Sequence, residues 1–451
     1  GVASALVASM VAGMASGARG HAARRFEATS QGWTLRRGKL VLLTALVSTS
    51  VGRGGGSETC APCETSKGPP AGEFATSLNG VRWPTLCINT SKPGHDHFFT
   101  IGDWGGMGHY PPKTFDNTQF KRPYIKGLDD NAQMNVAAVM KRVAKTSHPQ
   151  YVLNIGDNFY PGGVVTRCAQ ASMCDVIHTG QWTNSFERVY DGPDLAGKPW
   201  MGVLGNHDWG GWQFNKGWDQ SIAYTWHNDR WLTPALYWTR RVQYCDFAVD
   251  IFFADSNVFD AHPEEHDQEH NICSRLHNSR SNCADCGGPV NSETCYKWFR
   301  KLDNDQGKWL DQQLNQSDAD WQIVVTHFTP QWGAYKWQKL AAKYGIDLFV
   351  TGHRHQQEVH YKDNVMKNMG DTAWVVTGGG GGVTSEGNPM YEGPKMQQYG
   401  FMDIKISKHE LLIDMWSHSG KLRSTTTVTP RARAPLQPAV GGSSAVGATG
   451  G

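Results

Sequence analysis

Short apolar runs alternate with helix-like patterns along most of the chain. The run HFFTIG at 97–102 is followed at 131–145 by NAQMNVAAVMKRVAK, in which apolar side chains recur at the spacing of one helix face. Further strand-like runs lie at 151–156, 200–205, 235–255, 321–327 and 346–352, and further helical patterns at 306–314 and 335–345. This alternation of strands and helices predicts α/β layers.

The last apolar runs lack helices between them. They lie at 372–379, 399–407 and 409–417 and add strands to the end of the pattern. We therefore predict an α/β fold, a sandwich of two mixed β-sheets flanked by helices, with its folded domain at 96–418.

Neither end of the chain shows this alternation. Residues 1–95 mix small, basic and glycine-rich pieces and are predicted to be a targeting segment and linker, and residues 419–451, rich in Pro, Gly, Ser and Thr, a disordered tail. At 36–52, RRGKLVLLTALVSTSVG places basic residues before an apolar run that is too short to span a bilayer. This pattern is typical of a secretory signal, and a core strand is the alternative.

The composition gives no indication that the chain binds nucleic acid or an anionic membrane. Its 43 basic and 41 acidic residues leave a net charge of +2, so no global field attracts nucleic acid or an anionic membrane. The 18 tryptophans are interpreted as core and pocket walls, because no basic stripe lies among them.

Ten cysteines and two N-x-S/T acceptors, Asn89 and Asn315, indicate an oxidising compartment. With the signal-like segment they predict a glycosylated protein that is secreted or directed to an endomembrane or vacuolar-lysosomal compartment. We expect no membrane span in the mature form.

The segment 260–295 is predicted to be an insertion rich in cysteine and histidine. Its four cysteines can be interpreted as a zinc knuckle or as disulfides, and an oxidising compartment favours disulfides: Cys273, Cys283, Cys286 and Cys295. The same preference applies to Cys60 with Cys63 and to Cys168 with Cys174, and the pairings stay open. Because the insertion follows the strand-like run DIFFADS, we expect it to border the mouth of any site at the strand ends.

Five of the apolar runs end on residue types that bind metals. These are Asp103 in IGDWGG, Asp157 and Tyr160 in IGDNFY, Asn206 and His207 in LGNHDW, His327 in VVTHF, and His353 and His355 in TGHRH. Ligands of open α/β sheets bind beyond the carboxyl ends of the strands. The five endings therefore predict one shared metal site.

This set of motifs resembles the calcineurin-like metallophosphoesterases and, more closely, the purple acid phosphatases. In the wider superfamily the first motif is D-x-H, whereas here Asp103 is followed by Trp104 and Gly105. Tyr160 can supply the missing ligand, as it does in the purple acid phosphatases. A phenolate is a hard, strongly donating ligand that suits Fe(III), whose charge lowers the phenol pKa. The chain looks like the small form, similar to tartrate-resistant acid phosphatase.

The resemblance implies a role for each motif residue. Asp103, Tyr160 and His355 would hold Fe(III), Asp157 would bridge the two metals, and Asn206, His327 and His353 would hold Fe(II), Zn(II) or Mn(II). Asn206 and His207 would border the phosphate, and His207 would protonate the leaving group. The implied activity is that of a binuclear acid phosphatase that hydrolyses small phosphomonoesters through a metal-bound hydroxide.

One departure and two alternatives accompany this interpretation. Where the small enzymes carry a second outer-sphere histidine, this chain has Lys336, which can contact phosphate as a point charge. A catalytically idle scaffold or anchoring protein on this fold would show eroded ligands, and an ordinary phosphodiesterase would keep the missing histidine. The sequence therefore favours a phosphatase over both.

Overall fold

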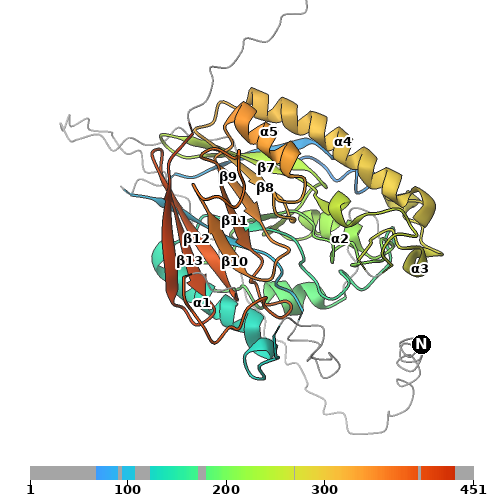
Figure 1. Ribbon diagram of the computed structural model, residues 1–451, viewed down its shortest axis with the longest axis horizontal. Helices are drawn as coiled ribbons and strands as arrows, with labels where there is room; N and C mark the ends of the chain where they lie inside the picture. The colour runs from blue at the N-terminus through green and yellow to red at the C-terminus, as the bar shows by residue number, and fades with distance from the viewer. Residues whose placement is uncertain are drawn as a thin grey trace, which may run out of the picture. The chain divides into compact units, whose positions relative to one another are not determined.

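The structure is a computed structural model that describes residues 68–89, 94–106, 122–170, 179–268, 270–394 and 398–431. These residues all belong to one compact unit, Ser57–Gly451. Within them, two seven-stranded sheets lie face to face, and helices cover their outer faces (Figure 1). The signal-like segment, Cys60, Cys63 and Cys174 lie outside the described residues.

The first sheet, here called sheet B, supplies three of the predicted ligand loops. Its strand order is β14-β13-β12-β2-β3-β4-β5. The strands are β2 (Asp96–Ile101), β3 (Val152–Asn154), β4 (Trp200–Gly202), β5 (Trp231–Leu232), β12 (Gly400–Ile406), β13 (Leu411–Ser417) and β14 (Leu422–Val428). Strands β2 to β5 run parallel, whereas β12 pairs antiparallel with β2, so the sheet is mixed.

The second sheet, sheet A, supplies the other two loops. Its order is β1-β6-β7-β8-β9-β11-β10. The strands are β1 (Val81–Cys87), β6 (Trp238–Gln243), β7 (Ala248–Phe253), β8 (Trp321–Val325), β9 (Leu348–Thr351), β10 (Gln357–His360) and β11 (Ala373–Thr377). Parallel pairs join β7, β8, β9 and β11, while β6 and β10 are antiparallel to their neighbours β7 and β11. The prediction of two mixed sheets is confirmed.

Alternating side chains divide the core into layers. In β2, Phe98 belongs to the core between the sheets, together with Ile251 of sheet A. The next residue, Phe99, belongs to the core on the opposite face, together with Val136 of α1 (Ala132–Ser147). Helices α4 (Ser292–Gln316) and α5 (Ala334–Tyr344) cover the outer face of sheet A. The result is a helix–sheet–sheet–helix sandwich (Figure 1).

The remaining helices are short. They are α2 (Trp218–Ala223), α3 (Arg275–Asn278), single 3-10 turns at Asp129–Asn131, Tyr224–Trp226, Asn257–Asp260 and Ala284–Cys286, and a π-helical turn at Trp182–Glu187. No helix in the described ranges combines the length and the apolar character that crossing a bilayer requires.

The folded region extends beyond the predicted range 96–418 at both ends. Strand β1 lies in the predicted linker, where it pairs with β6, and β14 lies in the predicted tail, where it pairs with β13. In β14 the sequence LRSTTTV is rich in Thr, which composition assigns to a tail but which suits a half-buried strand. Its buried positions include Arg423 and Val428.

Candidate metal centre

The five predicted motifs lie on loops at the ends of β2, β3, β4, β8 and β9. The first three strands belong to sheet B and the last two to sheet A. Asp103, Asp157 and His327 form the inner cluster, because they are buried and offer ligand atoms that all lie within 4.8 Å of one another. The site therefore lies where loops of both sheets meet.

His327 is oriented for metal binding. Its Nδ1 lies 2.8 Å from the carbonyl oxygen of Ile155, and this contact assigns the ring proton to Nδ1. Its Nε2 then faces the cluster, 3.3 Å from Oδ2 of Asp157 and 3.1 Å from Oδ1 of Asn206.

Tyr160 lies beside Asp103, as the missing histidine predicts. Its hydroxyl donates to Oδ2 of Asp157 at 2.8 Å and to Oδ1 of Asp103 at 3.1 Å. The Nε2 atom of His355 is 3.4 Å from the same hydroxyl. Only 5% of Tyr160 is exposed, so its hydroxyl lies within the buried cluster.

His353 completes the group of seven predicted ligands. Its ring centroid is 5.4 Å from that of His327, and its backbone amide donates to Oδ2 of Asp103 at 3.2 Å. The structure thus brings all seven side chains together, although their separate roles stay predictions.

Charge in this cluster is balanced by protons. Burial raises the pKa of Asp103 and, together with the two aspartates, that of Tyr160, so its phenol is neutral. Burial alone would raise the pKa of Asp157, but His327 outweighs it and lowers that pKa. Burial conversely lowers the pKa of His327, and Asp157 and Asp103 raise it to about 10. Cations would take the place of these protons, because clustered oxygen and nitrogen donors suit metal ions.

Backbone strain concentrates at the candidate ligands. Within the described part of the chain, eight non-glycine residues have a positive φ, and three of them are Asp103 at 57°, Asp157 at 53° and His353 at 66°. Such strain persists where surrounding structure imposes it and is common at functional sites. Glycines make room for it: a Cβ on Gly205 would lie 2.1 Å from Oδ1 of Asp157, and one on Gly352 2.5 Å from Oδ2 of Asp103.

His207 lies at the rim of the cluster. Its backbone amide donates to Oδ1 of Asp157 at 2.8 Å, and its ring centroid lies 4.5 Å from that of Tyr160. Its Nδ1 contacts the carbonyl oxygen of Pro161, which leaves Nε2 available. The nearby Asp260 is half-buried, and desolvation raises the pKa of its carboxyl to about 6, although the charge of His207 acts to lower that pKa.

Sequence reasoning missed Asp208, which joins two ligand loops. Its Oδ1 accepts from the backbone amide of Asn158 at 2.9 Å, and its Oδ2 accepts from Nδ2 of Asn158 at 2.9 Å and from the amide of Gly205 at 2.8 Å. Burial and the neighbouring Asp157 raise the pKa of Asp208 to about 7. The signal that identifies it is its place directly after Asn206 and His207 in GNHD.

Lys336 is engaged elsewhere. Its ammonium lies 2.6 Å from Oδ1 of Asp303 on α4 and 5.2 Å from the ring centre of Trp337. Among the described residues it forms no hydrogen bond or ion pair with a candidate ligand. Its predicted contact with phosphate therefore gains no support from the geometry.

The insertion at 260–295 is held by disulfides, as predicted. Cys273 bonds to Cys295, and Cys283 bonds to Cys168. The prediction for Cys286 is wrong, because this residue is a buried free thiol. The three sulfurs of Cys168, Cys283 and Cys286 lie close together, but the disulfide takes two of them, which disfavours the zinc knuckle.

The insertion packs against the loop that carries His207. Oδ1 of Asn278 accepts from the amide of Phe214 at 3.1 Å, and the ring of His277 lies 5.6 Å from that of Trp212. These contacts agree with the prediction that the insertion borders the mouth of the site.

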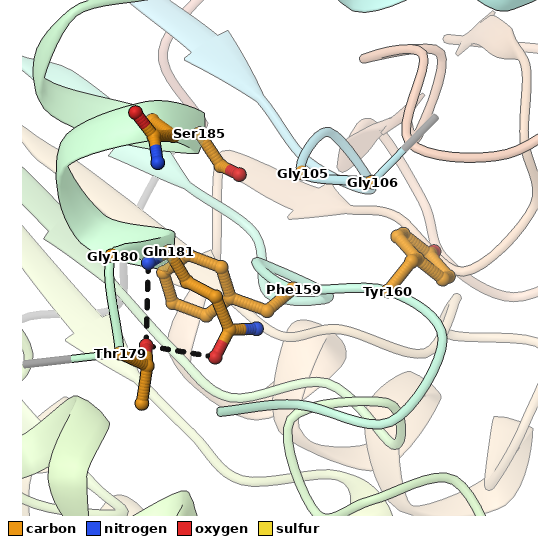
Figure 2. A pocket seen from close by; sticks show the side chains of 9 residues that line it. Gly105, Gly106, Phe159, Tyr160, Thr179, Gly180, Gln181 and Ser185 are labelled. Atoms are coloured by element: carbon orange, nitrogen blue, oxygen red, sulfur yellow. Dashed lines mark hydrogen bonds between the residues drawn. The ribbon is translucent and has the colours of Figure 1, made fainter. Parts of the chain in front are cut away.

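A pocket of about 250 Å³ opens beside Tyr160. In Figure 2, Thr179 and Gln181, which hydrogen-bond to each other, stand across from Tyr160. Its lining consists of Gly105, Gly106, Phe159, Tyr160, Thr179, Gly180, Gln181, Asn184 and Ser185. Space for part of a ligand therefore adjoins the candidate centre on the Tyr160 side.

Comparisons with known proteins relate the chain to a family of phosphoesterases. The family model of calcineurin-like phosphoesterases matches residues 97–357. The chain is 24% identical over 362 residues to purple acid phosphatase 3 of Arabidopsis thaliana, covering 76% of this chain and 81% of that protein. It is 23% identical over 353 residues to tartrate-resistant acid phosphatase type 5 of Oryctolagus cuniculus, covering 75% and 92%. A solved structure of GAP50, the anchor in the inner membrane complex of Plasmodium, aligns with a TM-score of 0.49 and 18% identity over 75% of this chain and 90% of that chain.

Proposed function

The chain belongs to the calcineurin-like phosphoesterase family, and from that premise we propose that it is a binuclear metal-dependent acid phosphatase acting on phosphomonoesters. One observation carries the proposal. The buried Tyr160 hydroxyl contacts Asp103, Asp157 and His355, and as a phenolate in this cluster it would suit Fe(III).

The proposed ligand sets follow the two sides of the cluster. Asp103, Tyr160 and His355 would bind Fe(III), Asp157 would bridge, and Asn206, His327 and His353 would bind Fe(II), Zn(II) or Mn(II). When bound, the two cations would hold the phosphate oxygens and activate water, and the trivalent ion would do so at acid pH. We therefore expect an acid pH optimum.

His207 is proposed to protonate the leaving oxygen. Within the described residues its Nε2 is the nitrogen without a backbone partner, and an imidazole is a common general acid near neutral or mildly acidic pH. Asp157 accepts the His207 backbone amide and so fixes the acid relative to the bridging ligand.

The disulfides support a location in an oxidising compartment, either secreted or endomembrane and vacuolar-lysosomal. Asn89 and Asn315 are both exposed, as glycosylation requires. Modification of these two residues stays a prediction.

Metal analysis combined with a visible spectrum tests the proposal. We expect purified protein to contain iron, to show a broad charge-transfer band, and to hydrolyse 4-nitrophenyl phosphate best at acid pH. Tyr160→Phe should abolish the band, whereas Tyr190→Phe, which alters a buried tyrosine outside the cluster, should retain it.

Three outcomes would contradict the proposal. An active, iron-loaded protein without the band would refute the role of Tyr160. A metal-loaded protein without hydrolysis would indicate the idle scaffold, and a preference for bis(4-nitrophenyl) phosphate would indicate a phosphodiesterase.

A further inference from the structure

Trp332 is an exposed tryptophan next to a candidate metal ligand. Of its side chain, 46% is exposed, in contrast to Trp104, Trp200 and Trp321, which are fully buried. Its ring centroid lies 6.1 Å from that of His353, at an interplanar angle of 90°. An apolar ring of this size exposed beside an anion-binding centre is a surface for a ligand that combines a ring with an anion.

The indole is held in place from behind. Phe328 lies 5.5 Å from it and Phe259 6.4 Å, both measured between ring centroids. Phe328 is itself fixed by the hydroxyl of Ser256, which accepts from its backbone amide at 2.9 Å. The amide of Trp332 donates to the carbonyl oxygen of Thr329 at 3.0 Å and closes the turn. The indole is thus packed against two aromatic rings while 46% of the residue stays exposed, and the side chain is preorganised for contact with a ligand ring.

The charges around the indole restrict the ligand further. Lys336, one turn along the chain, is paired with Asp303 at 2.6 Å and so offers no free cation for a second phosphate. A ligand that reaches from the centre to Trp332 would meet no free lysine at Lys336, so an uncharged ring suits the indole better than a second anion.

We propose that Trp332 is a specificity-determining residue whose indole stacks on the aromatic leaving group of an aryl phosphomonoester. The inference rests on the proposed function, because the centre must hold the phosphate. The aryl group can belong to a small ester or to a phosphotyrosyl side chain in a peptide, and both present the same ring to Trp332.

Calorimetric binding of two phosphonates to the metal-loaded protein tests the proposal without requiring turnover. Phenylphosphonate carries a ring and methylphosphonate does not. Trp332→Ala should weaken phenylphosphonate binding by about fivefold, the scale of an aromatic pair, and leave methylphosphonate binding unchanged. Trp332→Phe should restore most of the difference. Tyr335→Ala is the matched control, because Tyr335 is 80% exposed and only three residues away.

An equal change for both phosphonates, or no change for either, would overturn the role of Trp332. Wild-type protein that binds phenylphosphonate selectively but hydrolyses no phosphomonoester would instead refute the proposed function and leave the subsite standing. Melting temperatures of the variants separate a folding defect from a binding defect, and Trp332→Phe covers the case in which the alanine variant fails to fold. In the active enzyme, Trp332→Ala should lower kcat/KM for phenyl phosphate. If kcat/KM for a phosphotyrosyl peptide does not fall, the aryl group belongs to small esters; if it falls equally, phosphotyrosyl proteins are also substrates.

Discussion

At the scale of single residues, the centre is a cluster of carboxylates, a phenol and imidazoles. In the absence of metal, protons on these side chains occupy the positions that cations would take. The hydroxyl of Tyr160 donates to both Asp103 and Asp157. The same two carboxylates raise the pKa of His327 and so favour its protonated form. Loss of any carboxylate should therefore affect metal binding, whereas loss of a rim residue should not.

Asp157 and His207 provide the sharpest comparison. Asp157→Ala should lose metal and activity together, because its carboxylate contacts Tyr160 and His327. His207→Ala should retain both metals and slow the hydrolysis of esters with poor leaving groups by ~10²-fold, the usual scale of general acid catalysis. Metal content and kcat for alkyl and aryl esters measure the two effects. A His207 variant without metal would show that this residue is a ligand.

The candidate ligands could be predicted because each follows an apolar run directly, so that a local pattern marks a place in the fold. Asp208 and Trp332 could not be predicted in the same way. Asp208 acts through hydrogen bonds to Asn158 and Gly205, and only its place after Asn206 and His207 hints at this role. Trp332 acts through a ring contact with His353, which leaves no signal in one sequence.

At the scale of elements, segments with strong apolar patterns agreed with their predictions, and segments rich in polar residues did not. Helix α1 and strands β2, β8 and β9 bury strong apolar patterns. Strand β10, with the sequence QEVH, has only its first residue buried and was missed. Helix α4 begins at Ser292, inside the predicted insertion, where cysteines and polar residues concealed its helical pattern.

Helix α2 contains a carboxyl group that burial should make destabilising at neutral pH. Asp219 is 2% exposed, and burial raises its pKa to about 6. Within the described residues its Oδ1 has no hydrogen-bond partner, whereas Oδ2 accepts from the amide of Ala169 at 2.8 Å. The raised pKa means that ionisation of Asp219 is less favourable in the folded state than in the unfolded state. Its contribution to the free energy of unfolding is therefore fully present below the unfolded pKa near 4 and is lost as the pH rises through the folded pKa of about 6.

Asp219→Asn should therefore stabilise the protein above about pH 6 and have no effect below about pH 4. The expected gain approaches about 3 kcal/mol, since each pKa unit corresponds to about 1.4 kcal/mol. Urea unfolding of metal-free wild type and variant at both pH values measures it, and metal-free protein removes any contribution from ion release. A gain of equal size at both pH values would contradict the titration of Asp219.

At the scale of the whole described unit, ligand loops from sheet A and sheet B meet in one cluster. His327, after β8, lies 3.3 Å from Asp157, which follows β3 of the other sheet. An ion bound by both side chains would connect the sheets at this edge, and it would bind only the folded arrangement.

Chelation should therefore lower the thermal midpoint. An ion present at about 100 times its dissociation constant adds about 2.7 kcal/mol to the free energy of unfolding. Calorimetric scans with chelator, and again after metal is restored, should show a reversible fall in the midpoint. Asp157→Ala should not respond to chelator, and a wild-type midpoint that is equally insensitive would refute metal binding by both sheets.

The pairing of β2 with β12 also governs how the protein can be made. Strand β2 is synthesised early and positions Asp103, but its antiparallel neighbour β12 begins only at Gly400. On the ribosome, the nascent chain therefore carries an unpaired inner edge of sheet B through most of its elongation. Such an edge pairs readily with other strands, and non-local pairing is slow. We therefore expect chaperones that shield this edge until the last strands emerge to raise the yield of folded protein.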